Sequence, residues 1–102
     1  MVNEKREPVI WLNSLIEELG DLANNPDGAR ADAIVHYMGL LSRLVDEGEI
    51  RPDEYPAEFE RLRQAAKAAR EIVLNYEWLL KQFEVYRKDF PKSHWWWYPE
   101  EW

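Results

Sequence analysis

The segment HWWWYPEEW at residues 94–102 holds four of the six tryptophans in this chain of 102 residues. Each indole offers about 150–250 Å² of surface to bury and carries one N–H group that needs a partner. Large exposed aromatic patches are rare on soluble monomers, so we expect these residues, the aromatic tail, to fold back and dock on the rest of the chain. Exchange of the tail across a homodimer and its display for a partner are the alternatives.

The stretch before the tail carries the most regular helical pattern of the chain. Apolar residues recur there at alternating steps of three and four, as in the a and d positions of a heptad. This seam consists of Phe59, Leu62, Ala66, Ala69, Val73, Tyr76, Leu80 and Phe83. The pattern predicts one long helix over residues 56–89, with Val73, Tyr76 and Leu80 buried.

The second half of this predicted helix is apolar on nearly every side. Opposite the seam lie Leu74, Trp78 and Val85. A helix that is apolar all round is usually buried all round, so we expect the tail to cover that side. Because alternate side chains of an extended chain point to opposite sides, Trp95 and Trp97 should dock together while Trp96 faces outward, or the reverse.

The length of the predicted third helix raises a second question. At roughly 1.5 Å per residue it is about 50 Å long, whereas the two helices predicted before it are nearer to about 25–35 Å. Either the helix breaks or something covers its far end. A second copy of the chain could do so, because a twofold arrangement would bury both overhanging ends with the same patch. A homodimer is therefore one expected arrangement.

Two shorter helices are predicted before the long one, because apolar stripes at helical spacing cover residues 8–23 and 26–47. Asn25 can cap the second of these helices, with Pro26 in its first turn. Gly48 suits its end. A tight turn between the two helices would make them an antiparallel hairpin, and no segment shows the two-residue alternation of a strand.

The predicted fold is therefore all-α and forms a single domain over residues 1–102, since a chain of this length has room for one modest core. In this three-helix bundle the short antiparallel hairpin packs on one long third helix, and the aromatic tail docks on the long helix. The net charge of −7 argues against direct binding of nucleic acid or of anionic membranes. There is no cysteine, no secretory signal and no apolar run long enough to span a bilayer, so we expect a cytoplasmic protein.

A second group of candidate residues is acidic. Between residues 46 and 60 there are seven carboxylates and, apart from Arg51, no basic residue. Such a stretch could steer a basic partner or imitate the phosphates of a nucleic acid. Its simpler interpretation is a solvated loop with acids at the start of a helix, where they suit the helix dipole. The basic residues that follow directly, from Arg61 to Arg70, weaken the phosphate-mimic interpretation.

Signals for an enzyme or a metal site are sparse. The spacing of Arg30 and His36 superficially resembles the ribonuclease motif of HEPN domains, but six residues along a helix turn the two side chains about 120° apart. We expect His36 to pack beside the core or to pair with Asp32. Neither histidine has a glutamate three residues before it, as di-iron bundles require. We therefore predict no catalytic residue, no cofactor and no metal.

The sequence favours a small, acidic, non-enzymatic protein–protein interaction module. It could be an adaptor, an assembly subunit or a protein inhibitor of the kind often encoded by phages and mobile elements. The expected partner is another protein, whose identity the sequence leaves open. The candidate partner-binding residues are Trp78, Trp95, Trp96, Trp97, Tyr98, Trp102, Asp46, Glu47, Glu49, Asp53 and Glu54. The alternative is a helical-bundle binder of an apolar small ligand, followed by a HEPN-like ribonuclease or a nucleic-acid mimic.

Overall fold

The computed structural model describes residues 6–25 and 30–102, and within these ranges the protein is all-helical, without a strand. Its four α-helices are α1 (Arg6–Asn24), α2 (Ala31–Asp46), α3 (Pro56–Leu74) and α4 (Glu77–Tyr86). Four short 3₁₀ segments complete the described elements: η2 (Pro52–Glu54), η3 (Arg87–Asp89), η4 (Trp95–Trp97) and η5 (Pro99–Glu101). The all-α class is confirmed, but the single long third helix is wrong, because residues 56–89 form two helices.

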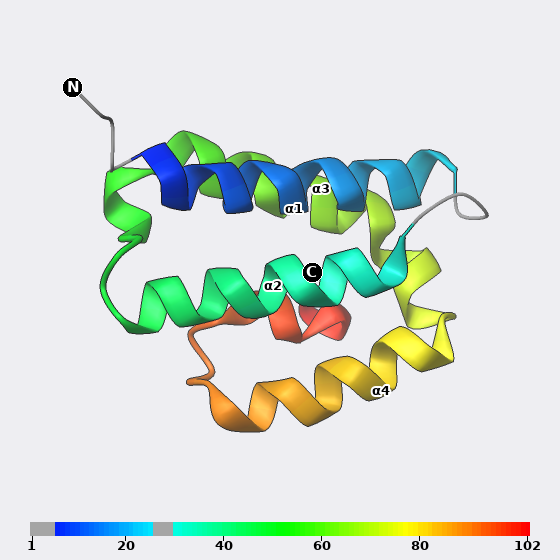
Figure 1. Ribbon diagram of the computed structural model, residues 1–102. Helices are drawn as coiled ribbons and strands as arrows, with labels where there is room; N and C mark the ends of the chain where they lie inside the picture. Colours follow the sequence, from blue (N-terminus) through cyan, green and yellow to red (C-terminus); the bar gives the residue numbers. More distant parts are fainter. Residues whose placement is uncertain (1–5, 26–29) are drawn as a thin grey trace.

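The aromatic tail lies between α2 and α4 (Figure 1). Helix α1 packs along both α2 and α3, while α4 packs on the same two helices from another side. The tail, red in Figure 1, lies between them, with η4 against α4 and η5 against α3. None of the described helices combines the length and the apolar character needed to cross a bilayer.

The core takes the apolar faces that the helical spacing predicts. Helix α1 buries Leu12, Leu15, Leu19 and Leu22, and α2 buries Ile34, Met38 and Leu41. Helix α3 buries Leu62, Ala66, Ala69 and Val73. The two alanines of α3 leave little side chain between the helices, and this permits the close packing of α1 along α3. Ile50, in the segment predicted as a plain loop, is also buried and anchors that segment to the core.

The break between α3 and α4 falls at Asn75 and Tyr76. The Asn75 side-chain amide donates to the Glu71 carbonyl at 2.9 Å, so it occupies an acceptor at the end of α3. Asparagine side chains compete in this way with continued helix. Tyr76 then adopts an extended conformation (φ −100°, ψ 93°) and is the N-cap of α4. The chain thereby changes direction, and the seam cannot continue across it.

The break changes which residues of α4 face inward. The predicted seam buries Tyr76 and Leu80, but Tyr76 is 38% exposed and Leu80 is only half-buried. Leu79 and Phe83 are buried instead. The predicted burial is therefore right for Val73 and wrong for Tyr76, because the inward face of α4 is set by its own orientation and not by the phase of α3.

The two ends of α2 differ in how well the sequence predicts them. Its N-cap is Arg30 and not Asn25, whose N–H instead donates to Asp21 O at 2.7 Å and closes α1. Pro26, predicted in the first turn of α2, lies outside the described residues. Gly48 ends α2 as predicted, with a φ of +81° that favours glycine. Its N–H donates to the Val45 carbonyl at 3.1 Å, as in a Schellman motif.

The reorientation of α4 can be tested by two neighbouring truncations. Leu79→Ala should lower the free energy of unfolding by about 2–5 kcal/mol, because it removes a fully buried side chain. Leu80→Ala should cost clearly less, since that side chain is half in solvent. Urea titrations followed by circular dichroism measure both. A loss at Leu80→Ala as large as that at Leu79→Ala would contradict the break and restore the continuous seam.

Candidate interaction site

The aromatic tail is coiled and not extended, which decides where its tryptophans point. Trp96 and Trp97 are 2% and 0% exposed, whereas Trp95 is half-buried. The expectation that alternate tryptophans face opposite sides is wrong for this reason. Residues Trp95–Trp97 form a 3₁₀ turn, in which successive side chains are about 120° apart, so two neighbours can both face inward.

Trp97 is held in an aromatic cluster at the inner side of α4. Its ring stacks on Tyr86 (centroids 5.4 Å apart) and on Phe90 (6.1 Å), and it meets Phe83 edge-on at 5.6 Å. The sequence predicted that the tail covers the Leu74–Trp78–Val85 side, and this prediction is wrong. Trp78 and Val85 are 44% and 59% exposed, because the break turns Leu79 and Phe83 toward the tail instead.

The buried tail is tied to α2 through one hydroxyl group. Trp96 Nε1 and Trp97 Nε1 each donate to Ser42 Oγ at 2.7 Å, and His94 Nδ1 lies 2.9 Å from the same oxygen. A hydroxyl has two acceptor lone pairs and one proton to donate. With both lone pairs occupied by indole N–H groups, the Ser42 O–H donates to His94 Nδ1, which is therefore unprotonated. Each of these buried polar groups is then paired.

The state of His94 follows from this arrangement. The imidazole is 3% exposed and stacks on Phe90 at 5.4 Å. Burial lowers the pKa of His94 below its ordinary value of 6.5, against a smaller opposing effect of the Asp46 carboxylate. Ser42 cannot act as a nucleophile in this environment, since it is fully buried and its lone pairs are occupied.

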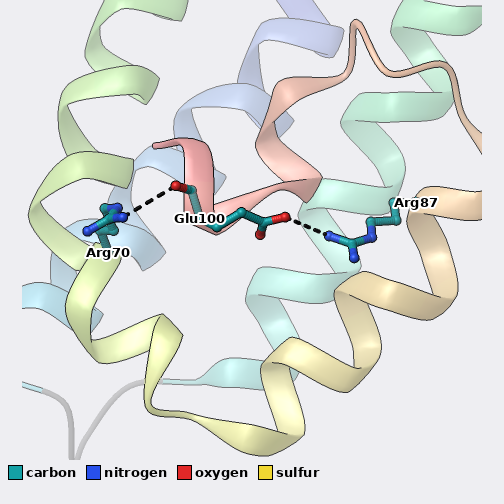
Figure 2. Close-up of polar contacts among 3 residues, drawn as sticks. All are labelled: Arg70, Arg87 and Glu100. Atoms are coloured by element: carbon teal, nitrogen blue, oxygen red, sulfur yellow. Dashed lines mark hydrogen bonds and ion pairs between the residues drawn. The ribbon is translucent and has the colours of Figure 1, made fainter.

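Two arginines fix the end of the tail at Glu100 (Figure 2). Arg70 of α3 donates to the Glu100 backbone carbonyl at 3.3 Å, and Arg87 of η3 pairs with the Glu100 carboxylate at 3.3 Å. The Arg87 guanidinium also lies 4.8 Å from the Tyr98 ring centre. Trp102 is buried beside Phe83, and its Nε1 finds no hydrogen-bond partner among the described residues. The tail thus contacts both α3 and α4.

A surface groove of about 290 Å³ opens beside the tail. It is lined by Val45, Pro52, Phe59, Arg63, Ser93, His94, Trp95 and Trp96. Trp95 is the half-buried indole of this groove, and the Arg63 guanidinium lies 4.2 Å above its ring. We call this feature the aromatic groove. It joins the end of α2, the start of α3 and the tail.

The predicted acidic residues lie at the same end of the molecule as the aromatic groove. Asp46, Glu47, Glu49, Asp53 and Glu54 are all exposed. Asp46 follows the groove residue Val45 in the chain, and Asp53 follows the groove residue Pro52. Asp53 is also 3.8 Å from Arg51 in an exposed ion pair. Asp46 and Asp53 are thus chain neighbours of groove residues, while Trp96, Trp97 and Trp102 are buried in the core and Trp78 lies apart on α4.

The remaining candidates from the sequence are Arg30 and His36. Arg30 and His36 are both exposed; the ring of His36 lies against Tyr37, and His36 has no ion pair with Asp32 within the described residues. Packing of His36 beside the core was therefore the wrong expectation. In the part of the chain that the structure describes, no three His, Asp or Glu side chains are grouped so that they could hold a metal ion.

Ser42 is the functional residue that the sequence interpretation missed. It lies on the inner face of α2 among leucines and a methionine, and a small polar residue there had no assigned partner. The tail, in turn, carried several indole N–H groups that needed acceptors. The sequence thus contained a signal for this contact: a buried hydroxyl without a partner and indole N–H groups that needed acceptors. Comparison of the chain with protein-family models, with curated proteins and with solved structures gave no match, so functional inference rests on the site itself.

The hydroxyl at position 42 should contribute strongly to stability. Ser42→Ala leaves two buried indole N–H groups without an acceptor, and each such loss costs roughly 1–3 kcal/mol. We expect the free energy of unfolding to fall by more than about 2 kcal/mol. The control is Ser14→Ala, at a half-buried serine of α1 whose hydroxyl bonds to no other described residue, and it should be nearly neutral. Equal effects of the two variants in a denaturant titration would refute the role of Ser42.

Stability should fall with acidification in a way that depends on His94. Because the pKa of His94 in the folded protein is below the unfolded value of 6.5, the unfolded chain binds the proton more readily. The stability is complete above about pH 6.5 and decreases as the pH falls below it. Denaturant titrations between about pH 7.5 and 5.5 measure this decrease. The decrease should vanish in His94→Gln and persist in His36→Gln. If it persisted in His94→Gln and vanished in His36→Gln, His94 would be excluded as its cause.

Proposed function

We propose that the protein is a non-enzymatic protein–protein interaction module that binds a basic segment of another protein at the aromatic groove. The observation that carries the proposal is the combination of an apolar, tryptophan-lined groove with exposed carboxylates next to it. Trp95 and Phe59 offer aromatic surface to an apolar side chain of the partner. The acids between Asp46 and Glu54 offer negative charge to the residues around it.

This combination has the physical features of a recognition surface. Aromatic side chains supply much of the binding free energy at protein interfaces, and tryptophan is enriched among the residues that matter most. Charges around such a centre mainly raise the association rate and select partners of opposite sign. An acidic rim beside an aromatic centre therefore favours a partner with a lysine- or arginine-rich segment that also carries an apolar residue. Adaptor, assembly-subunit and inhibitor roles all use such a surface.

The groove supports a protein partner better than the alternatives. Its volume of about 290 Å³ is at the lower limit of the roughly 300–1,000 Å³ typical of small-ligand pockets. The groove is also open at the surface, whereas an apolar ligand is usually enclosed. A hydrolytic role for the buried Ser42–His94 pair lacks access for a substrate. The lack of cysteine in the chain fits a reducing compartment, and we propose the cytoplasm.

The acidic rim can be tested with two variants of equal charge. The test variant Asp46→Asn/Glu49→Gln/Asp53→Asn neutralises the rim. The control Glu17→Gln/Asp21→Asn/Glu71→Gln neutralises three exposed acids on α1 and α3. Both change the net charge of −7 by the same amount. The test variant should bind the partner about tenfold more weakly, because it loses a few exposed charge pairs that each contribute up to about 1 kcal/mol. The control should keep its affinity.

The partner for this measurement is obtained by photo-crosslinking in the cells that make the protein. A crosslinking residue at position 54, beside the groove, should yield a discrete adduct that mass spectrometry identifies, and one at position 17 should not. Binding of the purified partner is then measured by titration calorimetry. Equal weakening by both charge variants, or an adduct from position 17 alone, would exclude the groove as the binding site.

A further inference from the structure

The outer face of α4 is apolar and exposed, although α4 is fully formed and packed on its inner side. Trp78 and Val85 share this face, since they are about two helical turns apart, and they are 44% and 59% exposed. Helix α4 forms one edge of the molecule in Figure 1, and the exposure of Trp78 and Val85 shows that the described elements leave this face open. Trp78 is the most exposed of the tryptophans.

A row of charges of alternating sign runs along one side of this face. It consists of Glu77, Lys81 and Glu84 of α4 and of Lys88 in the following segment η3. All four side chains are exposed, and none of them belongs to an ion pair with another described residue. The row is therefore available to charges on a partner that packs against the outer face.

The order of the charges in this row is self-complementary about one twofold axis. When two helices pack antiparallel about an axis perpendicular to both, the same side of each helix lies next to the same side of its copy. An axis that sets Glu77 opposite Lys88 of the copy passes between residues 82 and 83. The same axis sets Lys81 opposite Glu84 of the copy. Both pairs thus match in sign at once, and each occurs twice in the symmetric contact.

The apolar residues fit the same arrangement. The axis sets Trp78 opposite residue 87 of the copy, which is two residues or roughly 3 Å along the helix from Val85. The largest exposed ring of each chain then covers the most exposed valine of the other. A parallel packing has no such match, because it would set the charged side of one α4 against the Gln82–Tyr86 side of its copy.

We propose that α4 of this protein pairs with α4 of a second copy, antiparallel and about a twofold axis, to form a homodimer. The contact is formed by Trp78 and Val85 and is bordered by the row from Glu77 to Lys88. This surface is separate from the aromatic groove, so the inference does not rest on the proposed function. The dimer would display two grooves, one from each subunit.

A charge-exchange experiment tests the geometry. Lys81→Glu should weaken the dimer about tenfold, since it sets a glutamate opposite Glu84 of the copy at two symmetric places. Glu84→Lys should weaken it similarly, by setting a lysine opposite Lys81. A mixture of the two variants should restore association, because the heterodimer pairs glutamates of one chain with lysines of the other at every place. The double variant Lys81→Glu/Glu84→Lys should also dimerise.

Sedimentation equilibrium at concentrations up to about 100 μM measures association, and circular dichroism confirms that each variant is folded. The unsubstituted chain should sediment at twice its mass of 12.3 kDa. Trp78→Lys and Val85→Lys should each yield a folded monomer, while Ile10→Lys on α1, at a 56% exposed control site, should leave the dimer intact. A single 12.3 kDa species for the unsubstituted chain would overturn the proposal. So would a mixture that associates no better than its components, or a dimer broken by Ile10→Lys.

Discussion

The fold depends on the pairing of buried indole N–H groups with a single hydroxyl. If the N–H groups of Trp96 and Trp97 were buried without acceptors, each would cost roughly 1–3 kcal/mol of stability. Ser42 provides both acceptor sites and passes its own proton to His94. This uses the hydrogen-bonding capacity of the hydroxyl completely, and it fixes the tail at one position along α2.

The position of the tail in turn decides what the helices present to solvent. Because the tail lies between α2, α3 and α4, α4 must turn Phe83 and Leu79 toward it. The break at Asn75 permits this rotation, and its consequence is an outer face of α4 that carries Trp78 and Val85 in water. The same docking places Trp95 at the surface beside the end of α2, where it borders the aromatic groove.

Two surfaces therefore follow from one buried arrangement. The aromatic groove joins the half-buried Trp95 to Val45 and Pro52, the chain neighbours of Asp46 and Asp53, and the α4 face joins Trp78 and Val85 to a row of alternating charges. The pH-dependent contact between Ser42 and His94 lies beneath the groove, because His94 is one of the residues that line it. A change that releases the tail would consequently alter the groove together with the core.

The sequence by itself determined the helical class, the inward faces of α1, α2 and α3, and the end of α2 at Gly48, because periodicity and backbone preference are local properties. It also identified the tail as a segment that must be buried, since its aromatic surface was too large for solvent. The sequence could not determine the partner of that surface, the phase of α4 or the pairing of Ser42 with residues more than fifty positions away. These were decided only by tertiary structure, because hydrogen-bond partners distant in the sequence and the direction of the chain after a helix break depend on how all four helices pack at once.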